Sequence, residues 1–343
     1  MDAMSAAIYW AKETRERVRQ EMKPILTILE PEHFSEAALA RLREHFTFGL
    51  AIHSGVNGRI AVSEESGIVW VRLLRFDIAR CPKLRAIATN CTGTDHIDLE
   101  ECQRRGIEVL SLKGIEGLDN VHATAEHTIS LMLQALRHRC DRSSGRSGRE
   151  LRGKQVCIVG CGRIGQQVAD MTDTLTGRPA YVWPDDNVPA NNEDVLSYSD
   201  IVSIHASLNE TSKGMVNAEF LSKLKPGAIV VNTARDAIVD TEAMLTWLRD
   251  NPGSVYAHDF KQEFRIGALN SDHQLWSVAE EQVIGTEHIG GWTIESLHKT
   301  EELLAEKVIE WAKIRETGFC EVAPVNGCRA WKDSSGRTYV EGP

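Results

Sequence analysis

The chain has 343 residues, enough for about two domains of ordinary size. Its 39 basic and 49 acidic residues leave a formal net charge of −10, which argues against a surface for nucleic acid or for an anionic membrane. No apolar run reaches the roughly 18 to 20 residues that a membrane span needs, and the first 23 residues predict a surface helix rather than a targeting peptide. Eight cysteines without a C-x-x-C pair predict reduced thiols in a cytoplasmic protein and no metal site.

The first part of the chain alternates between short apolar runs and helical patterns. Residues 34–45 and 98–105 have helical spacing, and the apolar runs around them have the length of strands. These runs are residues 24–29, 46–52, 67–72, 84–89 and 107–110. Such alternation predicts a parallel sheet with helices on both faces.

A polar turn, residues 90–98, separates two of these runs. It follows a predicted strand, and open α/β sheets bind their ligands at the carboxyl ends of strands. The alternative is an ordinary turn in which Asp98 caps the next helix. Residues 124–136 then predict a long helix, and residues 142–148 form a connector rich in Ser, Gly and Arg. A domain boundary is therefore expected near this helix.

A G-x-G-x-x-G turn follows a further apolar run, residues 156–159. Gly160 permits the tight turn, Gly162 lets the backbone approach a pyrophosphate, and Gly165 lets the helix pack closely on the strand. The helix start, with Arg163 and Ile164, presents backbone N–H groups that would hold the phosphate charge. Glycine triplets also occur by chance, so the prediction of a dinucleotide site depends on the strands and the acidic residues after the turn.

Five more strand-length runs follow the glycine turn and make six strands with the first. They are residues 180–183, 201–205, 228–232, 254–258 and 282–285. Helical segments, among them residues 220–224 and 241–248, separate most of them. The pattern predicts the six-stranded sheet of a dinucleotide-binding domain. A last helix is expected over residues 300–314, and the tail after Gly318 has no readable pattern.

Asp185 lies 20 residues after Gly165, just past the second of these strands. A carboxylate at this position accepts hydrogen bonds from the adenosine ribose and repels a 2′-phosphate, which favours NAD over NADP. Asp186 is the adjacent candidate, and a pair of acidic turn residues without a ligand is the alternative interpretation.

Five blocks in the chain together resemble the NAD-dependent D-2-hydroxyacid dehydrogenases. They are TGTDHID (92–98), NVHATAEH (120–127), LRGKQVCIVGCGRIG (151–165), LKPGAIVVNTAR (224–235) and EHIGGWT (287–293). The resemblance covers roughly residues 83–311. It implies an α/β fold with two doubly wound parallel-sheet domains, in which a Rossmann-type NAD domain (residues 123–292) is inserted in a flavodoxin-like substrate domain (residues 1–122 and 293–343). It also implies a homodimer to which the helix at 124–136 contributes, with an intradomain core helix as the alternative.

Oxidation of a 2-hydroxy acid needs a group that takes the hydroxyl proton and a cation that holds the carboxylate. Arg235 follows a predicted strand, and its planar guanidinium suits a two-bond grip on a carboxylate. His288 follows the sixth strand, and an imidazole can exchange a proton near neutral pH. His205 is expected to be structural. The family pattern adds a carboxylate that orients the histidine, and Glu263 is the candidate for that role.

The resemblance assigns further contacts to this site. Thr233 is expected to contact the cofactor, and Asp259 is expected to bind the nicotinamide carboxamide. Backbone N–H groups of Thr92 and Gly93 are expected to hold the substrate carboxylate, with Arg72 as an additional cation.

Several residues depart from the family pattern. Glu263 lies four residues after Asp259, where the family has a spacing of five, and no Pro follows it. Asp236 stands where the family prefers Gly after the Arg, and Ser207 replaces a Pro. A carboxylate beside Arg235 could compete with the substrate for the guanidinium.

The substrate is left open by the sequence. The blocks around residues 93–98 and 285–295 resemble most closely the erythronate-4-phosphate dehydrogenase branch, which implies a phosphorylated four-carbon acid. Phosphoglycerate, glycerate, lactate-like acids and phosphite are the other candidates, whereas Gln262 does not fall where formate dehydrogenases place their Gln. A NAD-sensing regulatory protein on the same fold is the alternative from another class, and the presence of Arg235 and His288 favours an enzyme.

Overall fold

The computed structural model describes residues 23–53, 60–138, 140–143, 145–183, 193–261, 280–317, 319–325, 328–333 and 338–340. The chain divides into two compact units, Met1–Leu118 with Leu297–Pro343, and Asp119–Ser296. The second unit thus interrupts the first. It extends four residues beyond each of the expected boundaries, residues 123 and 292. The predicted N-terminal helix lies outside the described residues. Among the helices that the structure describes, none is long and apolar enough to cross a membrane.

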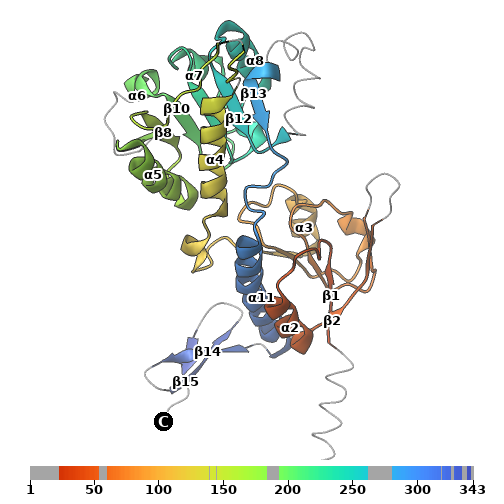
Figure 1. Cartoon of the computed structure of the whole chain (residues 1–343). Coiled ribbons are helices and arrows are strands. Elements are labelled where there is room, and N and C mark those ends of the chain that lie inside the picture. Colours follow the sequence, from red (N-terminus) through yellow and green to blue (C-terminus); the bar gives the residue numbers. More distant parts are fainter. Residues whose placement is uncertain are drawn as a thin grey trace, which may run out of the picture. The chain divides into compact units, whose positions relative to one another are not determined.

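The sheet of the first unit has five parallel strands in the order β2-β1-β5-β6-β7 (Figure 1). They are β1 (Ile25–Ile28), β2 (Thr47–Phe48), β5 (Ile68–Trp70), β6 (Ala86–Thr89) and β7 (Glu108–Ser111). In chain order this is 2-1-3-4-5, the flavodoxin-like arrangement that the resemblance implied. The apolar run at 46–52 is divided: β2 joins the sheet, and β3 (Ala51–His53) pairs antiparallel with β4 (Ile60–Val62).

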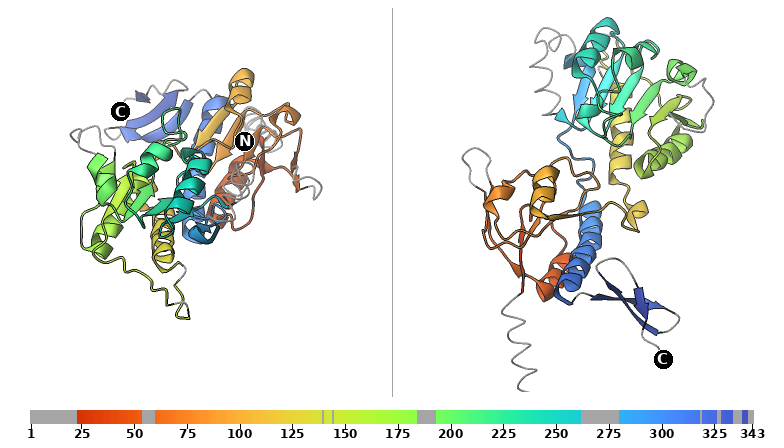
Figure 2. Two further views of the ribbon diagram at one scale, coloured as in Figure 1. Left: turned by 90° about the horizontal axis from the view of Figure 1, so that it is seen from above. Right: turned by 180° about the vertical axis from the view of Figure 1, so that it is seen from behind.

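Helices of the first unit begin at side chains that accept backbone hydrogen bonds. Ser35 caps α2 (Glu36–His45), and Asp98 caps α3 (Leu99–Arg105) by accepting a hydrogen bond of 2.9 Å from the N–H of Glu101. The expected last helix is α11 (Ile294–Thr317), which begins before residue 300. In this unit α11 lies beside α2 (Figure 2). The N–H of Ser35, which precedes α2, donates to Glu301 Oε2 on α11 at 2.7 Å.

The tail after α11, for which the sequence has no readable pattern, contains three antiparallel strands. They are β14 (Phe319–Val325), β15 (Cys328–Asp333) and β16 (Thr338–Val340). They form a sheet in the order β14-β15-β16.

The second unit contains six parallel strands in the order β13-β12-β11-β10-β8-β9, as the six apolar runs predict. They are β8 (Val156–Val159), β9 (Tyr181–Trp183), β10 (Ile201–Ile204), β11 (Ile229–Asn232), β12 (Val255–His258) and β13 (Val283–Gly285). From β8 the chain passes to one side to form β9 and then to the other side to form β10. The switch point, where open sheets bind ligands, therefore lies between β8 and β10.

Helices cover both faces of this sheet because alternate strand residues point to opposite sides. Val156 and Ile158 pack against α4 (Ala123–Arg137) and α5 (Arg163–Thr176), while Cys157 and Val159 pack on the other face. That second face is covered by α6 (Glu193–Tyr198), α7 (Ala218–Ser222) and α8 (Thr241–Asp250) (Figure 1). Short 3₁₀ turns join other elements: η1 (Ile78–Arg80), η2 (Leu118–Asn120), η3 (Asp236–Ile238) and η4 (Glu280–Gln282).

Candidate active site

The three glycines after β8 meet three different local demands. Gly160 has φ of +90°, and a Cβ at this residue would lie 2.6 Å from the backbone N of Ala206, which follows β10. A Cβ at Gly165 would lie 2.2 Å from the carbonyl oxygen of Gly160, so α5 can approach the turn only with glycine there. At Gly162 a Cβ would meet nothing within 4 Å, which leaves open space over the turn for a ligand.

The start of α5 leaves its backbone N–H groups for an anion. Gly162 is the N-cap and offers no side-chain cap. The guanidinium of Arg163 donates to the carbonyl of Val121 at 2.9 Å, and Ile164 packs against the core on the α4 face of the sheet. Burial lowers the pKa of Arg163, partly offset by Asp119. Both residues thus anchor the helix start through their side chains, and the open turn with uncapped N–H groups fits a pyrophosphate.

Thr233 and Arg235 emerge where β11 ends. The hydroxyl of Thr128 on α4 donates its proton to the carbonyl of Thr124 at 2.7 Å. The Thr128 oxygen therefore accepts a hydrogen bond from the hydroxyl of Thr233, which lies 2.8 Å away. Arg235 is half-buried, and its Nη1 donates to the carbonyl of Ala234 at 2.7 Å.

Asn232, which no pattern in the sequence singles out, shapes this turn. Its Nδ2 donates to the carbonyl of Arg235 at 2.9 Å, and its Oδ1 accepts from the N–H of Ala234 at 3.0 Å. A buried amide that bridges both sides of a turn restricts the backbone that bears the guanidinium. Asp236 begins η3 directly after Arg235 and is half-buried.

His288 follows β13 with φ of +55°, a left-handed conformation that is unusual for a residue with a Cβ. Its N–H donates to the carbonyl of Asp259 at 3.0 Å, and its ring packs edge-on against Phe260 at 5.1 Å. The side chain is half-buried. Asp259 and Phe260 directly follow β12, the strand between β11 and β13, so Arg235 and His288 both emerge at the carboxyl edge of one sheet.

The carboxylate of Asp259 holds the backbone around His288. Oδ1 accepts from the N–H of Ile289 at 2.9 Å and from the hydroxyl of Thr286 at 2.6 Å, and Oδ2 accepts from the N–H of Gly290 at 2.6 Å. Burial alone would raise the pKa of Asp259, but hydrogen bonds from these groups and from His127 hold the pKa below its ordinary value. The family resemblance predicts a cofactor contact for Asp259, and no pattern in the sequence indicates this second role.

Two other histidines of this unit lie at strand ends, and His205 is half-buried whereas His258 is buried. His205 follows β10, and its Nε2 lies 2.8 Å from the hydroxyl of Ser203. His258 ends β12 and stacks on Tyr256 with ring centroids 4.8 Å apart. Burial lowers the pKa of His205 and of His258 to about 4 in each case. Both imidazoles are therefore held in their uncharged form near neutral pH, as a structural rather than a proton-transferring role predicts.

Arg72 in the first unit is engaged in a buried ion pair. Its Nη2 donates to Glu301 Oε1 at 2.6 Å, with 3% of the arginine side chain and none of the glutamate side chain exposed. Nη1 donates to the carbonyl of Glu32 at 2.9 Å. Thr92 and Gly93 follow the neighbouring strand β6; Thr92 is exposed and Gly93 is half-buried.

Two of the predicted site residues, Asp185 and Glu263, lie outside the described residues. Asp98, the last residue of the 92–98 block, caps α3 and so has a structural role. Thr92 and Gly93 lie at the start of the block, at the edge of the sheet.

Comparison with known proteins agrees with this geometry. Residues 121–290 match the family model of the D-isomer specific 2-hydroxyacid dehydrogenases, NAD binding domain. A glyoxylate reductase of Thermofilum pendens is 33% identical over 253 residues, which cover 66% of this chain and 72% of that protein. A D-3-phosphoglycerate dehydrogenase of Mycobacterium tuberculosis is 31% identical over 250 residues, and the match spans 67% of this chain but only 46% of that longer protein.

The fold is shared with solved structures. The NAD⁺-bound 3-phosphoglycerate dehydrogenase of Entamoeba histolytica superposes with a TM-score of 0.67 at 22% identity, over 86% of this chain and 96% of that one. The glycine turn after β8, the matched NAD-binding domain and the similarity over two thirds of the chain lead to one conclusion. The chain belongs to the NAD-dependent D-2-hydroxyacid dehydrogenases, a family of oxidoreductases.

Proposed function

We propose that the enzyme reduces a small 2-keto acid to a D-2-hydroxy acid, or catalyses the reverse oxidation, with Arg235 and His288 as its catalytic residues. The observation that supports this assignment is their placement at the carboxyl ends of β11 and β13, the two strands that flank β12 in one sheet. Bound NADH supplies the hydride to the carbonyl carbon. Arg235 binds the substrate carboxylate and stabilises the negative charge that develops on the carbonyl oxygen, and His288 donates a proton to that oxygen. In the oxidative direction His288 accepts the hydroxyl proton.

The cofactor contacts are assigned to the second unit. In the proposal the N–H groups at the start of α5 hold the pyrophosphate, Asp185 binds the adenosine ribose, and Thr233 contacts the cofactor beyond β11. The nicotinamide carboxamide is expected to donate to Asp259 Oδ2. Among the described residues, this oxygen accepts a hydrogen bond from the N–H of Gly290. Glu263 orients His288 in this proposal.

The proposed substrate carries one anionic group. In the proposal this group is a carboxylate, which Arg235 binds. Arg72, the additional cation that the sequence offers, is already neutralised by Glu301 within the first unit. A phosphorylated acid would need a further cation, so small unphosphorylated acids such as glyoxylate or pyruvate are the preferred class.

The reaction is tested by following NADH consumption with a panel of 2-keto acids, phosphorylated ones included, using His288→Ala as the control for adventitious reduction. Turnover of an unphosphorylated acid that His288→Ala loses supports the proposal. Turnover restricted to phosphorylated acids would reject the substrate class. NADH binding with no turnover of any acid would reject the enzyme and favour a cofactor-sensing role.

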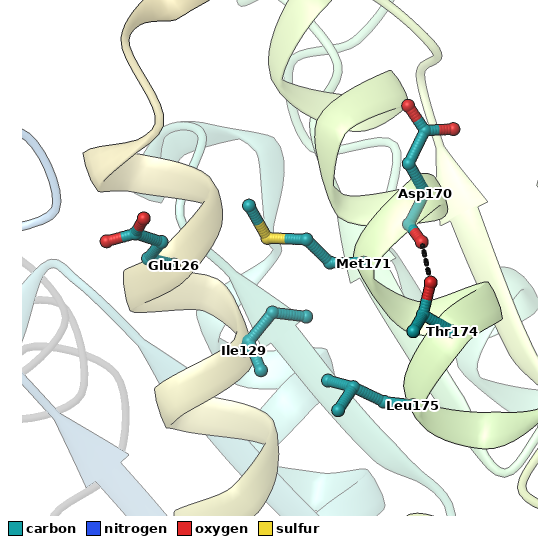
Figure 3. A pocket seen from close by; sticks show the side chains of 6 residues that line it. All are labelled: Glu126, Ile129, Asp170, Met171, Thr174 and Leu175. Atoms are coloured by element: carbon teal, nitrogen blue, oxygen red, sulfur yellow. Dashed lines mark hydrogen bonds between the residues drawn. The ribbon is translucent and has the colours of Figure 1, made fainter.

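We also propose that the enzyme is a cytoplasmic homodimer. In the second unit a groove of about 490 Å³ lies between α4 and α5, lined by Glu126, Ile129, Asp170, Met171, Thr174 and Leu175 (Figure 3). Leu175 on α5 is 44% exposed, and Leu133 on α4 is 47% exposed. Apolar side chains left in solvent on the helix that the resemblance assigns to dimerisation favour a second copy of this chain as the occupant.

A further inference from the structure

We propose that His127 is a positioning residue for the reaction. Through Thr286 and Asp259 it holds residues 288–290 in the conformation that presents the His288 imidazole. We call His127, Thr286 and Asp259 the loop clamp. The inference rests on the proposed catalytic role of His288 and assigns a function to a histidine that the chemistry above does not use.

The hydrogen bonds of the loop clamp have one consistent direction. An ionised carboxylate only accepts, so the hydroxyl of Thr286 donates to Asp259 Oδ1 at 2.6 Å. The oxygen of Thr286 therefore accepts from His127 Nε2, which lies 3.0 Å away. The same nitrogen lies 3.5 Å from Asp259 Oδ1. The arrangement requires a proton on Nε2 of His127, so this histidine acts as a donor in the clamp.

Asp259 passes this constraint to the backbone that bears His288. Its carbonyl accepts from the N–H of His288, and its two carboxylate oxygens accept from the next two N–H groups. Three consecutive backbone donors are thus bound to one residue. They stabilise the left-handed conformation of His288, with φ of +55°, which a residue with a Cβ does not adopt readily.

The surroundings of the clamp leave little room for adjustment. Asp259 is 2% exposed, and a Cβ at Gly290 would lie 2.9 Å from its Oδ2. The side chain of His127 is 14% exposed and comes from α4, whereas Thr286 and Asp259 follow β13 and β12. His127, on a helix that covers one face of the sheet, therefore fixes the loop after β13 at the sheet edge. Because the surroundings are tightly packed, a displacement of the Asp259 carboxylate would also displace this loop.

His127→Leu removes the N–H donor while keeping an apolar volume on α4. We expect kcat to fall about tenfold, because a small displacement of a catalytic group has a large effect on rate. The dissociation constant for NADH should change less than about twofold, since the glycine turn is untouched. His127→Gln can place an amide N–H near the Nε2 position and should restore kcat to within about threefold of the wild type.

His122→Leu is the matched control, because His122 is exposed at the N-cap of the same helix and makes no side-chain cap bond. It should leave kcat unchanged. Measurements of kcat, KM, NADH affinity and melting temperature on the full-length enzyme separate positioning from misfolding. A wild-type kcat for His127→Leu would overturn the proposal, and so would a folded, NADH-binding His127→Gln that is as slow as His127→Leu.

Should His127→Leu fail to fold, Thr286→Val and Thr286→Ser test the same clamp. The valine variant lacks the hydroxyl and should lose kcat, while the serine variant keeps it and should not; equal rates would overturn the proposal. His288→Ala distinguishes the two levels of inference. If His288→Ala is inactive and His127→Leu is fully active, only the clamp is rejected, whereas an active His288→Ala rejects the proposed catalytic role itself.

Discussion

The N–H of His288 donates to the carbonyl of Asp259 at 3.0 Å and ties the residue after β13 to the residue after β12. The bond joins two neighbouring strand ends, and it holds a histidine whose backbone has a positive φ. Backbone strain of this kind is common at active sites, where the surrounding hydrogen bonds maintain it, and His288 is the residue proposed above for proton transfer.

Two substitutions of His288 separate the loss of its imidazole from the relief of its backbone strain. His288→Ala and His288→Gly should both lower kcat by about 100-fold or more, because the proton donor is lost. His288→Gly should be more stable than His288→Ala by about 1 kcal/mol, since glycine adopts the left-handed conformation without a Cβ penalty. Turnover and urea unfolding of the two variants check this. Equal stability would show that the positive φ carries no strain, and retained turnover would remove His288 from the mechanism.

Cofactor selectivity is predicted to depend on Asp185. NADH should raise the melting temperature of the wild type and NADPH should not, because the carboxylate repels a 2′-phosphate. Asp185→Ala should weaken NADH binding about tenfold, the effect of losing hydrogen bonds to a charged group. The adjacent Asp186→Ala is the control and should bind like the wild type. Equal thermal shifts with both cofactors, or a larger effect at Asp186, would contradict the assignment.

Acid is predicted to destabilise the second unit through His205 and His258. Each has a folded-state pKa of about 4, below the ordinary value near 6.5 in the unfolded chain. Between these two pH values the unfolded chain binds more protons, so the free energy of unfolding falls as the pH falls, by about 1.4 kcal/mol per pH unit for each histidine. Urea unfolding between pH 7 and pH 4.5 measures this slope.

A single substitution isolates one histidine of this pair. His205→Gln, which cannot titrate, should reduce the slope by about half relative to the wild type. An unchanged slope in this variant would show that His205 is not excluded from protonation in the folded protein.

Arg72 is predicted to be structural rather than a substrate cation. Glu301→Leu leaves a buried guanidinium without its carboxylate and should cost about 3–5 kcal/mol of stability. Arg72→Met combined with Glu301→Leu removes both charges and should recover most of that loss, with kcat/KM within about threefold of the wild type. A stable double variant with a large loss in kcat/KM would return Arg72 to the substrate site.

The groove between α4 and α5 is predicted to be the dimer contact. Met171→Glu and Leu175→Glu place charges in it and should shift the protein to monomer in size-exclusion chromatography with light scattering. Tyr198→Glu, at an apolar side chain on α6 that is 68% exposed and lies away from the groove, should leave the oligomeric state unchanged. A wild-type protein that is already monomeric would reject the homodimer.

Local patterns in the sequence determined the elements and where their reactive residues emerge. Apolar runs of strand length predict the strands of both parallel sheets, because buried strands are apolar on both faces. The glycine spacing after β8 predicts the turn, and a strand that ends before Arg235 or His288 places each residue at the sheet edge. These properties depend on residues close together in the chain.

Only the tertiary structure decided which residues these side chains contact. Arg72 and Glu301 are 229 residues apart, and no local pattern indicates that one neutralises the other. Asp259 likewise binds a loop about 30 residues farther on and is held by His127 from another element. Such partners are selected when strands and helices pack, because a buried charge must be satisfied by whatever donors the fold brings to it.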